Sequence, residues 1–172
     1  MSCAYRTLRH ALVIIASTGL SVGCTAVTQT RTVETSDTYQ HWSEKMDHMP
    51  FLFHLPDGRT EAFDDHGKAW ADAGSHIEAS GADRVEVYIG NFSGRSDTLC
   101  AVQPKAQLSN ASADDANVLS ALCDHSRTVV SFSDHARPRV LAATDNYVGR
   151  VRHLLLNGIW KSVAQEPDPR PY

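Results

Sequence analysis

The pattern of apolar and polar positions along the chain first predicts strands. Residues 51–55 carry an apolar side chain at every second position, and residues 56–58, Pro-Asp-Gly, are a strong turn signal. Residues 60–63 can return as the partner strand, so the sequence predicts a hairpin. Residues 84–89 alternate most clearly, which predicts a half-buried strand. Its apolar face holds Val85, Val87 and Ile89, and its other face holds Arg84, Glu86 and Tyr88.

Three segments have apolar residues at helical spacing. The first prediction is a helix over 65–81, with Asp65 as its N-cap and Gly81 as its stop. The second is a helix over 112–123, opened by a sequence that resembles a capping box. The third is a long helix over 144–160. The apolar faces are Trp70, Ala73 and Ile77; Val118, Leu119 and Leu122; and Tyr147, Val148, Val151, Leu154, Leu155, Ile159 and Trp160.

A weaker strand over 98–102 and another strand over 128–132 complete the pattern. We therefore expect an α+β fold, a single small domain with about three helices packed on a mainly antiparallel sheet. This globular domain is expected over residues 46–164. Residues 24–45 are rich in Thr, Ser and Gln and predict a flexible tether after the N-terminus. Residues 165–172 contain three prolines and predict an extended tail.

The first 23 residues have the organisation of a secretion signal. Arg6 and Arg9 precede an uncharged, mainly apolar run that ends at Cys24 and is too short to span a bilayer. This segment resembles the bacterial lipoprotein signal, which implies that Cys24 is acylated and becomes the mature N-terminus. In that class Thr25, since it is not Asp, implies the outer membrane, with the protein facing the periplasm. The alternative is an ordinary cleaved signal that leaves Cys24 as a thiol.

Size and charge narrow the functional classes. Removal of residues 1–23 leaves 149 of the 172 residues, which is enough for one hydrophobic core. The formal net charge then falls from −4 to −6, because two arginines are lost with the signal. A mildly acidic chain without a Lys/Arg cluster is poorly suited to nucleic acid or to anionic headgroups. We expect no nucleic-acid partner, and membrane contact through the lipid anchor alone.

The four cysteines have separate expected fates. Cys3 is lost with the signal and Cys24 is the lipidation candidate, so Cys100 and Cys123 remain as a pair. Two such cysteines usually form a disulfide in an oxidising compartment. A redox couple or a metal pair is the alternative, but neither a CxxC spacing nor nearby ligands support it. The sequence therefore predicts a structural Cys100–Cys123 bridge.

A histidine- and methionine-containing segment is the weak candidate for a metal site. His41, Met46, His48 and Met49 combine imidazole and thioether groups, which suit copper, above all Cu(I), and imidazole also suits zinc. Their spacing matches no closed ligand set. The alternative is that the methionines and Trp42 begin the core while the histidines stay exposed.

Two Asp-His steps contain the residue types of a nucleophilic triad. They are Asp124-His125-Ser126 and Ser133-Asp134-His135, but a triad is defined by spatial geometry and not by adjacency. Both steps follow predicted elements, where Asp and Ser commonly form turns. The pair Asp64-Asp65 is explained in the same way, by the start of a predicted helix. Nucleotide-binding and zinc-protease motifs do not occur in the sequence, and we expect no cofactor.

The loop over 90–97 is the candidate partner-binding segment. It follows the clearest strand, and Phe92 and Arg95 are a plausible anchor pair for a protein partner. The alternative is a solvated hairpin connection.

The sequence as a whole favours a lipid-anchored envelope protein, a non-enzymatic binding or accessory domain that contacts another envelope component. The alternatives are an envelope hydrolase with a dispersed His/Asp/Ser site, and copper or zinc handling through residues 41–49.

Overall fold

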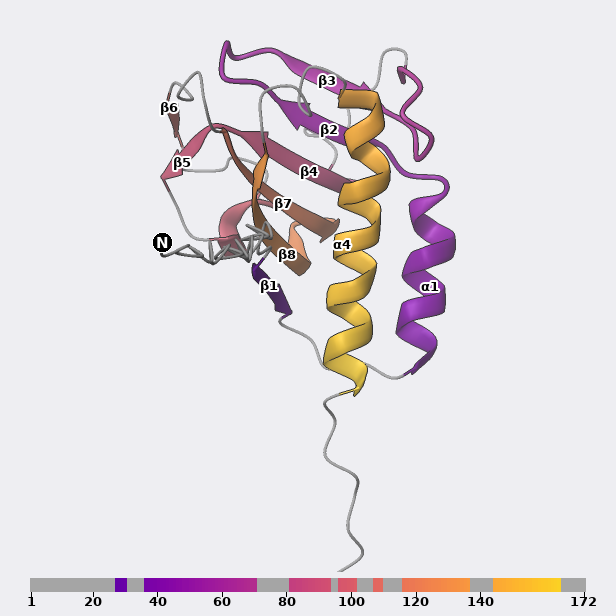
Figure 1. Cartoon of the computed structure of the whole chain (residues 1–172). Helices are drawn as coiled ribbons and strands as arrows, with labels where there is room; N and C mark the ends of the chain where they lie inside the picture. The colour runs from indigo at the N-terminus through magenta and orange to yellow at the C-terminus, as the bar shows by residue number, and fades with distance from the viewer. Residues whose placement is uncertain are drawn as a thin grey trace, which may run out of the picture.

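A central strand, β4 (Arg84–Ile89), lies inside a mixed six-stranded sheet in the computed structural model (Figure 1). The strand order is β1-β8-β7-β4-β2-β3, and β2 and β4 form the parallel pair of that sheet. The other strands are β1 (Val27–Thr30), β2 (Phe51–His54), β3 (Thr60–Phe63), β7 (Ala116–Asp124) and β8 (Arg127–Ala136). A separate two-stranded sheet pairs β5 (Asn91–Ser93) with β6 (Gln107–Ser109). The structure describes residues 27–30, 36–70, 81–93, 96–101, 107–109, 116–136 and 144–164.

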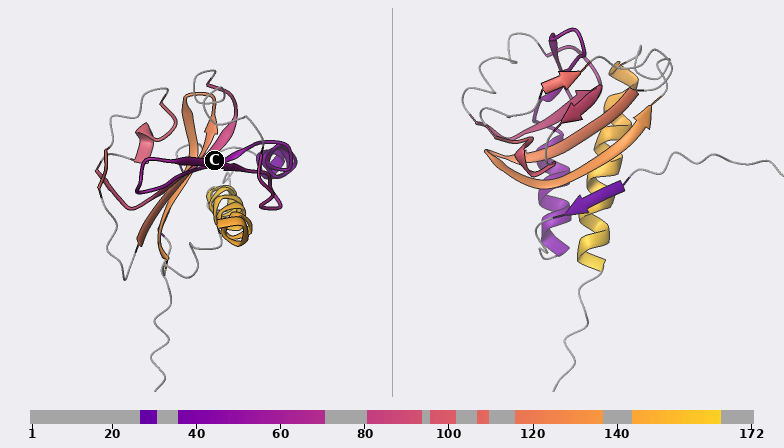
Figure 2. Two further views of the ribbon diagram at one scale, coloured as in Figure 1. Left: turned by 90° about the horizontal axis from the view of Figure 1, so that it is seen from above. Right: turned by 90° about the vertical axis from the view of Figure 1, so that its left-hand side faces the viewer.

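Two helices, α1 (Ser36–Met46) and α4 (Thr144–Ala164), run side by side along one face of this sheet (Figures 1 and 2). The main core lies between these helices and the sheet. Its largest fully buried apolar side chains are Met46, Phe51, Phe53, Phe132, Tyr147, Leu122 and Leu155. Burying such a side chain stabilises the fold by about 1.5–3 kcal/mol. The α+β class, the 51–63 hairpin, the strand over 84–89 and the long C-terminal helix are therefore confirmed.

The folded region begins earlier than residue 46. Residues 27–30 form an edge strand against β8, and α1 packs on α4. Trp42 and Met46 of α1 are buried in the main core, and Tyr39 packs against it. The prediction of a flexible tether over 24–45 is thus wrong for the described residues of that range. A polar composition concealed three apolar positions, 39, 42 and 46, at helical spacing.

The predicted helix over 112–123 is wrong, because residues 116–124 form β7 between β4 and β8. Val118 and Leu122 belong to the main core, whereas Ala121 and Cys123 belong to a cluster of the opposite face. A strand buried on both faces reads as a near-continuous apolar run, which can be mistaken for a helical face. The predicted strand over 98–102 is also wrong, since Ser96–Thr98 is a short 3-10 helix followed by a turn.

The predicted helix over 65–81 does not begin at Asp65. The Asp64 side chain accepts hydrogen bonds from the backbone N–H groups of His66 (3.0 Å) and Lys68 (2.7 Å), which builds a turn. Residue 69 then pairs with Phe63, while residues 71–80 lie outside the described part of the chain. The described residues therefore contain two α-helices, where about three were expected.

The second face of β4 is covered and not solvated. The side chains of Arg84 and Glu86 are 1 % and 2 % exposed, and Tyr88 is buried beside them. The Cys100–Cys123 disulfide, which confirms the predicted pairing, attaches the segment around residue 100 to β7 with a Cα–Cα distance of 5.4 Å. The prediction that the strand over 84–89 is half-buried is wrong. The alternation of charged and apolar residues is the same whether the charged face contacts solvent or is covered by another segment of the chain.

A buried carboxylate fixes the first turns of α4 to β8. Asp134 accepts hydrogen bonds from the Tyr147 hydroxyl (2.9 Å) and from Nε of Arg150 (2.8 Å). Burial, together with the nearby Asp134 charge, raises the pKa of the Tyr147 hydroxyl well above its usual range. Asp134 therefore has a structural role.

In the described residues no helix is long and apolar enough to cross a membrane.

Two glycines offer a matched test of backbone conformation. A Cβ added at Gly149 or at Gly58 would meet no atom within 4 Å, but Gly58 has φ +83° whereas Gly149 lies inside α4. We expect Gly149→Ala to raise the free energy of unfolding by about 1 kcal/mol, since Ala favours helix over Gly. Gly58→Ala should lower it by about 1 kcal/mol, because Ala is strained at positive φ. Urea unfolding of both variants checks the opposite signs, and equal effects would contradict them.

Candidate functional site: the α1–α4 hollow

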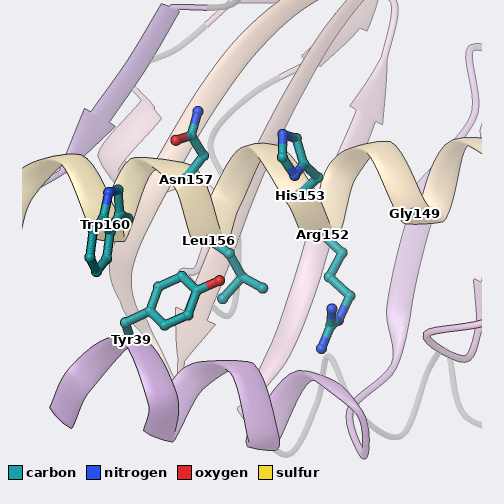
Figure 3. A pocket seen from close by; sticks show the side chains of 7 residues that line it. All are labelled: Tyr39, Gly149, Arg152, His153, Leu156, Asn157 and Trp160. Carbon is teal, nitrogen blue, oxygen red and sulfur yellow. The ribbon is translucent and has the colours of Figure 1, made fainter. Parts of the chain in front are cut away.

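The helical layer carries a surface hollow of about 480 Å³, which we call the α1–α4 hollow. It is lined by Tyr39 of α1 and by Gly149, Arg152, His153, Leu156, Asn157 and Trp160 of α4. Figure 3 shows Tyr39 and Arg152 between the two helices, with His153 and Asn157 on the other side of α4. The volume lies within the range of about 300–1,000 Å³ that is typical of ligand sites. The α1–α4 hollow is therefore the candidate binding site.

Trp160 is the most unusual residue of this lining. Its side chain is 57 % exposed, and it is the exposed large hydrophobic residue of the described chain. Tyr39 packs against it edge to face, with ring centroids 5.9 Å apart and an interplanar angle of 75°. This contact holds the indole in place while leaving much of it open to a ligand. The sequence-based assignment of Trp160 to the core is wrong, because Trp160 lies beside the buried stripe and not in it.

Arg152 joins the two helices at the wall of the hollow. Its Nη2 donates to the backbone carbonyl of Ser43 (3.2 Å) and to Oδ1 of Asp47 (2.5 Å). Its Nε is buried and has no hydrogen-bond partner within the described residues. In contrast, the side chains of His153 and Asn157 form no hydrogen bonds in that part of the chain. These two side chains remain available as donors and acceptors for a ligand.

A second hollow, of about 510 Å³, adjoins the first, because Gly149 and Arg152 line both. Its remaining lining is Asp47, His48, Asp65 and His66. Gly149 has no side chain, so the surface of α4 stays open at the junction. The two hollows together give the helical layer an extended, polar and aromatic surface.

The candidate metal ligands of residues 41–49 are not brought together. Met46 and Met49 are buried in the core, whereas His41 and His48 are exposed. The His41 ring meets Trp42 edge to face, with centroids 5.3 Å apart. Because the thioethers are occupied in packing, the structure favours the core-packing alternative for this segment.

The described residues contain one group of side chains compact enough to share a metal ion, namely Asp83, Asp124 and His125. His125 has φ 55° in the β7–β8 turn, and its Nδ1 lies 3.0 Å from Asp124 Oδ1, so these adjacent side chains do meet. Lys45 binds Asp83 at 2.6 Å and Arg127 binds Asp124 at 2.7 Å. Hydrogen bonds from His125 and Arg127 hold the pKa of Asp124 below its usual range. The cations already balance both carboxylates, so the group is an ion network of the turn.

A chain of polar contacts runs from the buried Arg84–Glu86 pair to the exposed Thr60 at the start of β3. Glu86 binds Nε of Arg84 at 2.5 Å and Nε2 of His54 at 2.6 Å, and the other ring nitrogen of His54 lies 3.1 Å from the Thr60 hydroxyl. The His54 ring stacks on Tyr88 with centroids 4.2 Å apart. Hydroxyl, imidazole and carboxylate in this order resemble a nucleophile–base–acid relay. Arg84 already neutralises the carboxylate, so we interpret the chain as structural.

The predicted partner-binding pair falls partly outside the described residues. Phe92 lies in β5, but its side chain is not among the described ones, and Arg95 lies outside them altogether. Cys24 also lies outside them. The residues that sequence reasoning missed are those of the hollow. A signal for them exists, because His153, Asn157 and Trp160 are spaced i, i+4 and i+7 and therefore share one helical face.

The fold and the hollow define the class of protein only as a small α+β domain with an aromatic, polar surface site. Comparison with protein-family models, with curated proteins and with solved structures finds no match to this chain. The function must therefore be argued from the site.

Proposed function

We propose that this chain is an exported, lipid-anchored binding protein of the cell envelope. Acylated Cys24 holds it at the outer membrane, and the domain faces the periplasm. It recognises another envelope component through the α1–α4 hollow, without catalysing a reaction. The observation that carries the proposal is Trp160, whose indole is exposed yet held by Tyr39 in a hollow of ligand size.

The disulfide supports the exported location. Cys100 and Cys123 are buried and bonded, and such bonds form and persist in oxidising compartments outside the cytosol. The anchor rests on the resemblance of the N-terminus to the lipoprotein signal. Several acyl chains on one cysteine would hold the domain stably on a leaflet.

The anchor predicts a specific labelling result. Cells fed a palmitate analogue should incorporate it into the wild-type chain, and Cys24→Ala should abolish the label by removing the acylated thiol. Mass analysis of the mature N-terminus is the second readout. An unlabelled wild-type chain would contradict the anchor but would leave the hollow as a binding site.

The binding role predicts a position-specific crosslink in intact cells. A benzophenone amino acid at Asn157, in the hollow, should form an adduct with the recognised component. The same group at Asp57, in the exposed β2–β3 turn, serves as the matched control and should not. Gly149→Trp should remove the Asn157 adduct, because the new side chain enters open space in the hollow. An Asn157 adduct that survives this substitution, or none at all, would overturn the proposal.

A further inference from the structure

We infer that the α1–α4 hollow takes an acidic glycan, with one sugar ring on Trp160 and a carboxylate near the cations of α4. The inference rests on the proposed function and specifies its ligand. The stripe from Gly149 to Trp160 is about 16 Å long at the rise of an α-helix, which suits an elongated chain of several rings. Gly149, His153 and Trp160 lie along this stripe on one side of α4.

The chemistry of the lining matches a sugar. A pyranose ring has an apolar C–H face, which can lie against an exposed indole, and a rim of hydroxyl groups. Asn157 supplies an amide that both donates and accepts hydrogen bonds, and His153 supplies two ring nitrogens that can hydrogen-bond to hydroxyl groups. The Tyr39 contact fixes the indole before the ligand arrives, which reduces the entropy lost on binding.

The distribution of charge selects an acidic sugar. The chain is acidic overall, with a formal net charge of −4. Beyond Asp145, however, α4 contains no acid and carries Arg150, Arg152 and Lys161. The two arginines are paired with Asp134 and Asp47, whereas exposed Lys161 forms no ion pair among the described residues. One unpaired cation, Lys161, therefore lies next to Trp160 in sequence, and the described lining of the hollow contains no carboxylate, which favours an anionic ligand.

A peptide fits this surface less well. Two common modes of peptide binding are the addition of a strand to a sheet edge and the placing of apolar anchors in a groove. The hollow lies on helices, whose backbone groups are already hydrogen-bonded within the helix. Leu156 is the aliphatic side chain of the lining, and it is almost fully buried. The surface is therefore aromatic and polar and lacks apolar anchor pockets.

The inference is tested by titrating the full chain, purified with its native N-terminus in detergent, with tetramers of galacturonic acid, N-acetylglucosamine, glucose and glutamic acid. We expect saturable binding of the galacturonic acid tetramer that weakens as salt rises. Trp160→Ala should weaken it at least tenfold. Lys161→Gln should weaken it about threefold and reduce its salt dependence. Arg59→Gln, which removes an exposed cation from the distant β2–β3 hairpin, should have no effect.

Each other outcome overturns the inference. Absence of saturable binding, equal affinity for the glucose tetramer, or an unchanged Trp160→Ala affinity would each exclude an acidic glycan on Trp160. Tighter binding of the glutamic acid tetramer would assign the hollow to acidic peptides. If glycan binding fails while the Asn157 crosslink persists, the proposed function stands and only the ligand class is wrong. If both fail, the hollow is not the binding site.

Discussion

Glu86→Ala is expected to lower the free energy of unfolding by about 3–5 kcal/mol, the cost of breaking a buried ion pair. The Glu86 carboxylate is the counter-ion of Arg84, and both side chains are almost completely buried. Arg84 cannot relax into solvent, because its guanidinium also donates to the backbone carbonyls of Ala82, His125 and Cys100. Its charge would therefore stay in the interior without a counter-ion. Urea unfolding measures the change, against a total stability of about 5–15 kcal/mol for a domain.

The double variant Arg84→Met, Glu86→Leu separates charge from packing. It removes both charges while keeping much of the volume, so it should be more stable than Glu86→Ala. The double variant should regain only part of the lost stability, because the three backbone carbonyls that accept hydrogen bonds from Arg84 lose their donor. Asp57→Ala, which breaks an exposed pair with Arg59, is the surface control and should cost under 1 kcal/mol. A Glu86→Ala cost as small as this control would contradict the buried-pair account.

Local patterns in the sequence were sufficient for part of the fold. The hairpin needs only a short alternating run and the Pro-Asp-Gly turn, in which Gly58 has the positive φ that such a turn requires. The long helix α4 has a sustained 3.6-residue pattern, and β4 has the clearest period of two. The disulfide followed from counting cysteines. Each of these signals depends on neighbours in sequence, which is why it survives without tertiary information.

The wrong predictions concern segments whose structure depends on tertiary contacts. The helical and strand interpretations of 116–124 both place apolar residues inside, and only the positions of β4 and β8 on either side select the strand. Arg84 and Glu86 lie on a face of the sheet that a later segment of the chain covers. The sequence of residues 84–89 alone does not indicate that this face is buried. The same difficulty affected α1, whose core contacts come from α4 at the far end of the chain.

The candidate site was hidden for a related reason. Ile159 and Trp160 are adjacent and both apolar, yet the first is 2 % exposed and the second 57 %. Hydrophobicity alone cannot separate them, because the boundary of the buried stripe depends on how α4 is rotated against the sheet. Tyr39 comes from a helix more than a hundred residues earlier, so the edge-to-face contact has no local signature. The sequence shows which residue types are present, but it does not show that Tyr39 and Trp160 lie side by side in the fold.

The double variant Cys100→Ala, Cys123→Ala should lower the free energy of unfolding by about 3.5 kcal/mol in the chain-entropy model. The bridge closes a sequence separation of 23 residues and so restricts the unfolded chain. The denaturant m value should rise, because an unrestricted chain exposes more surface. Wild-type protein unfolded under a reductant should match the variant, which controls for the changed side chains. A loss below 1 kcal/mol, or an unchanged m value, would contradict this role.

The disulfide and the buried ion pair should also prove to be coupled. The segment that carries Cys100 accepts a hydrogen bond from Arg84 through its own carbonyl at 3.1 Å, so the bridge holds part of the cover over the pair. Without the bridge the segment around residue 100 can move away from the sheet, and in the Glu86→Ala variant water can then solvate the Arg84 guanidinium. Glu86→Ala should therefore cost at least 1 kcal/mol less in the cysteine-free background than in the wild type. A double-mutant cycle from urea unfolding measures the difference, and strict additivity would show that the cover does not depend on its covalent link.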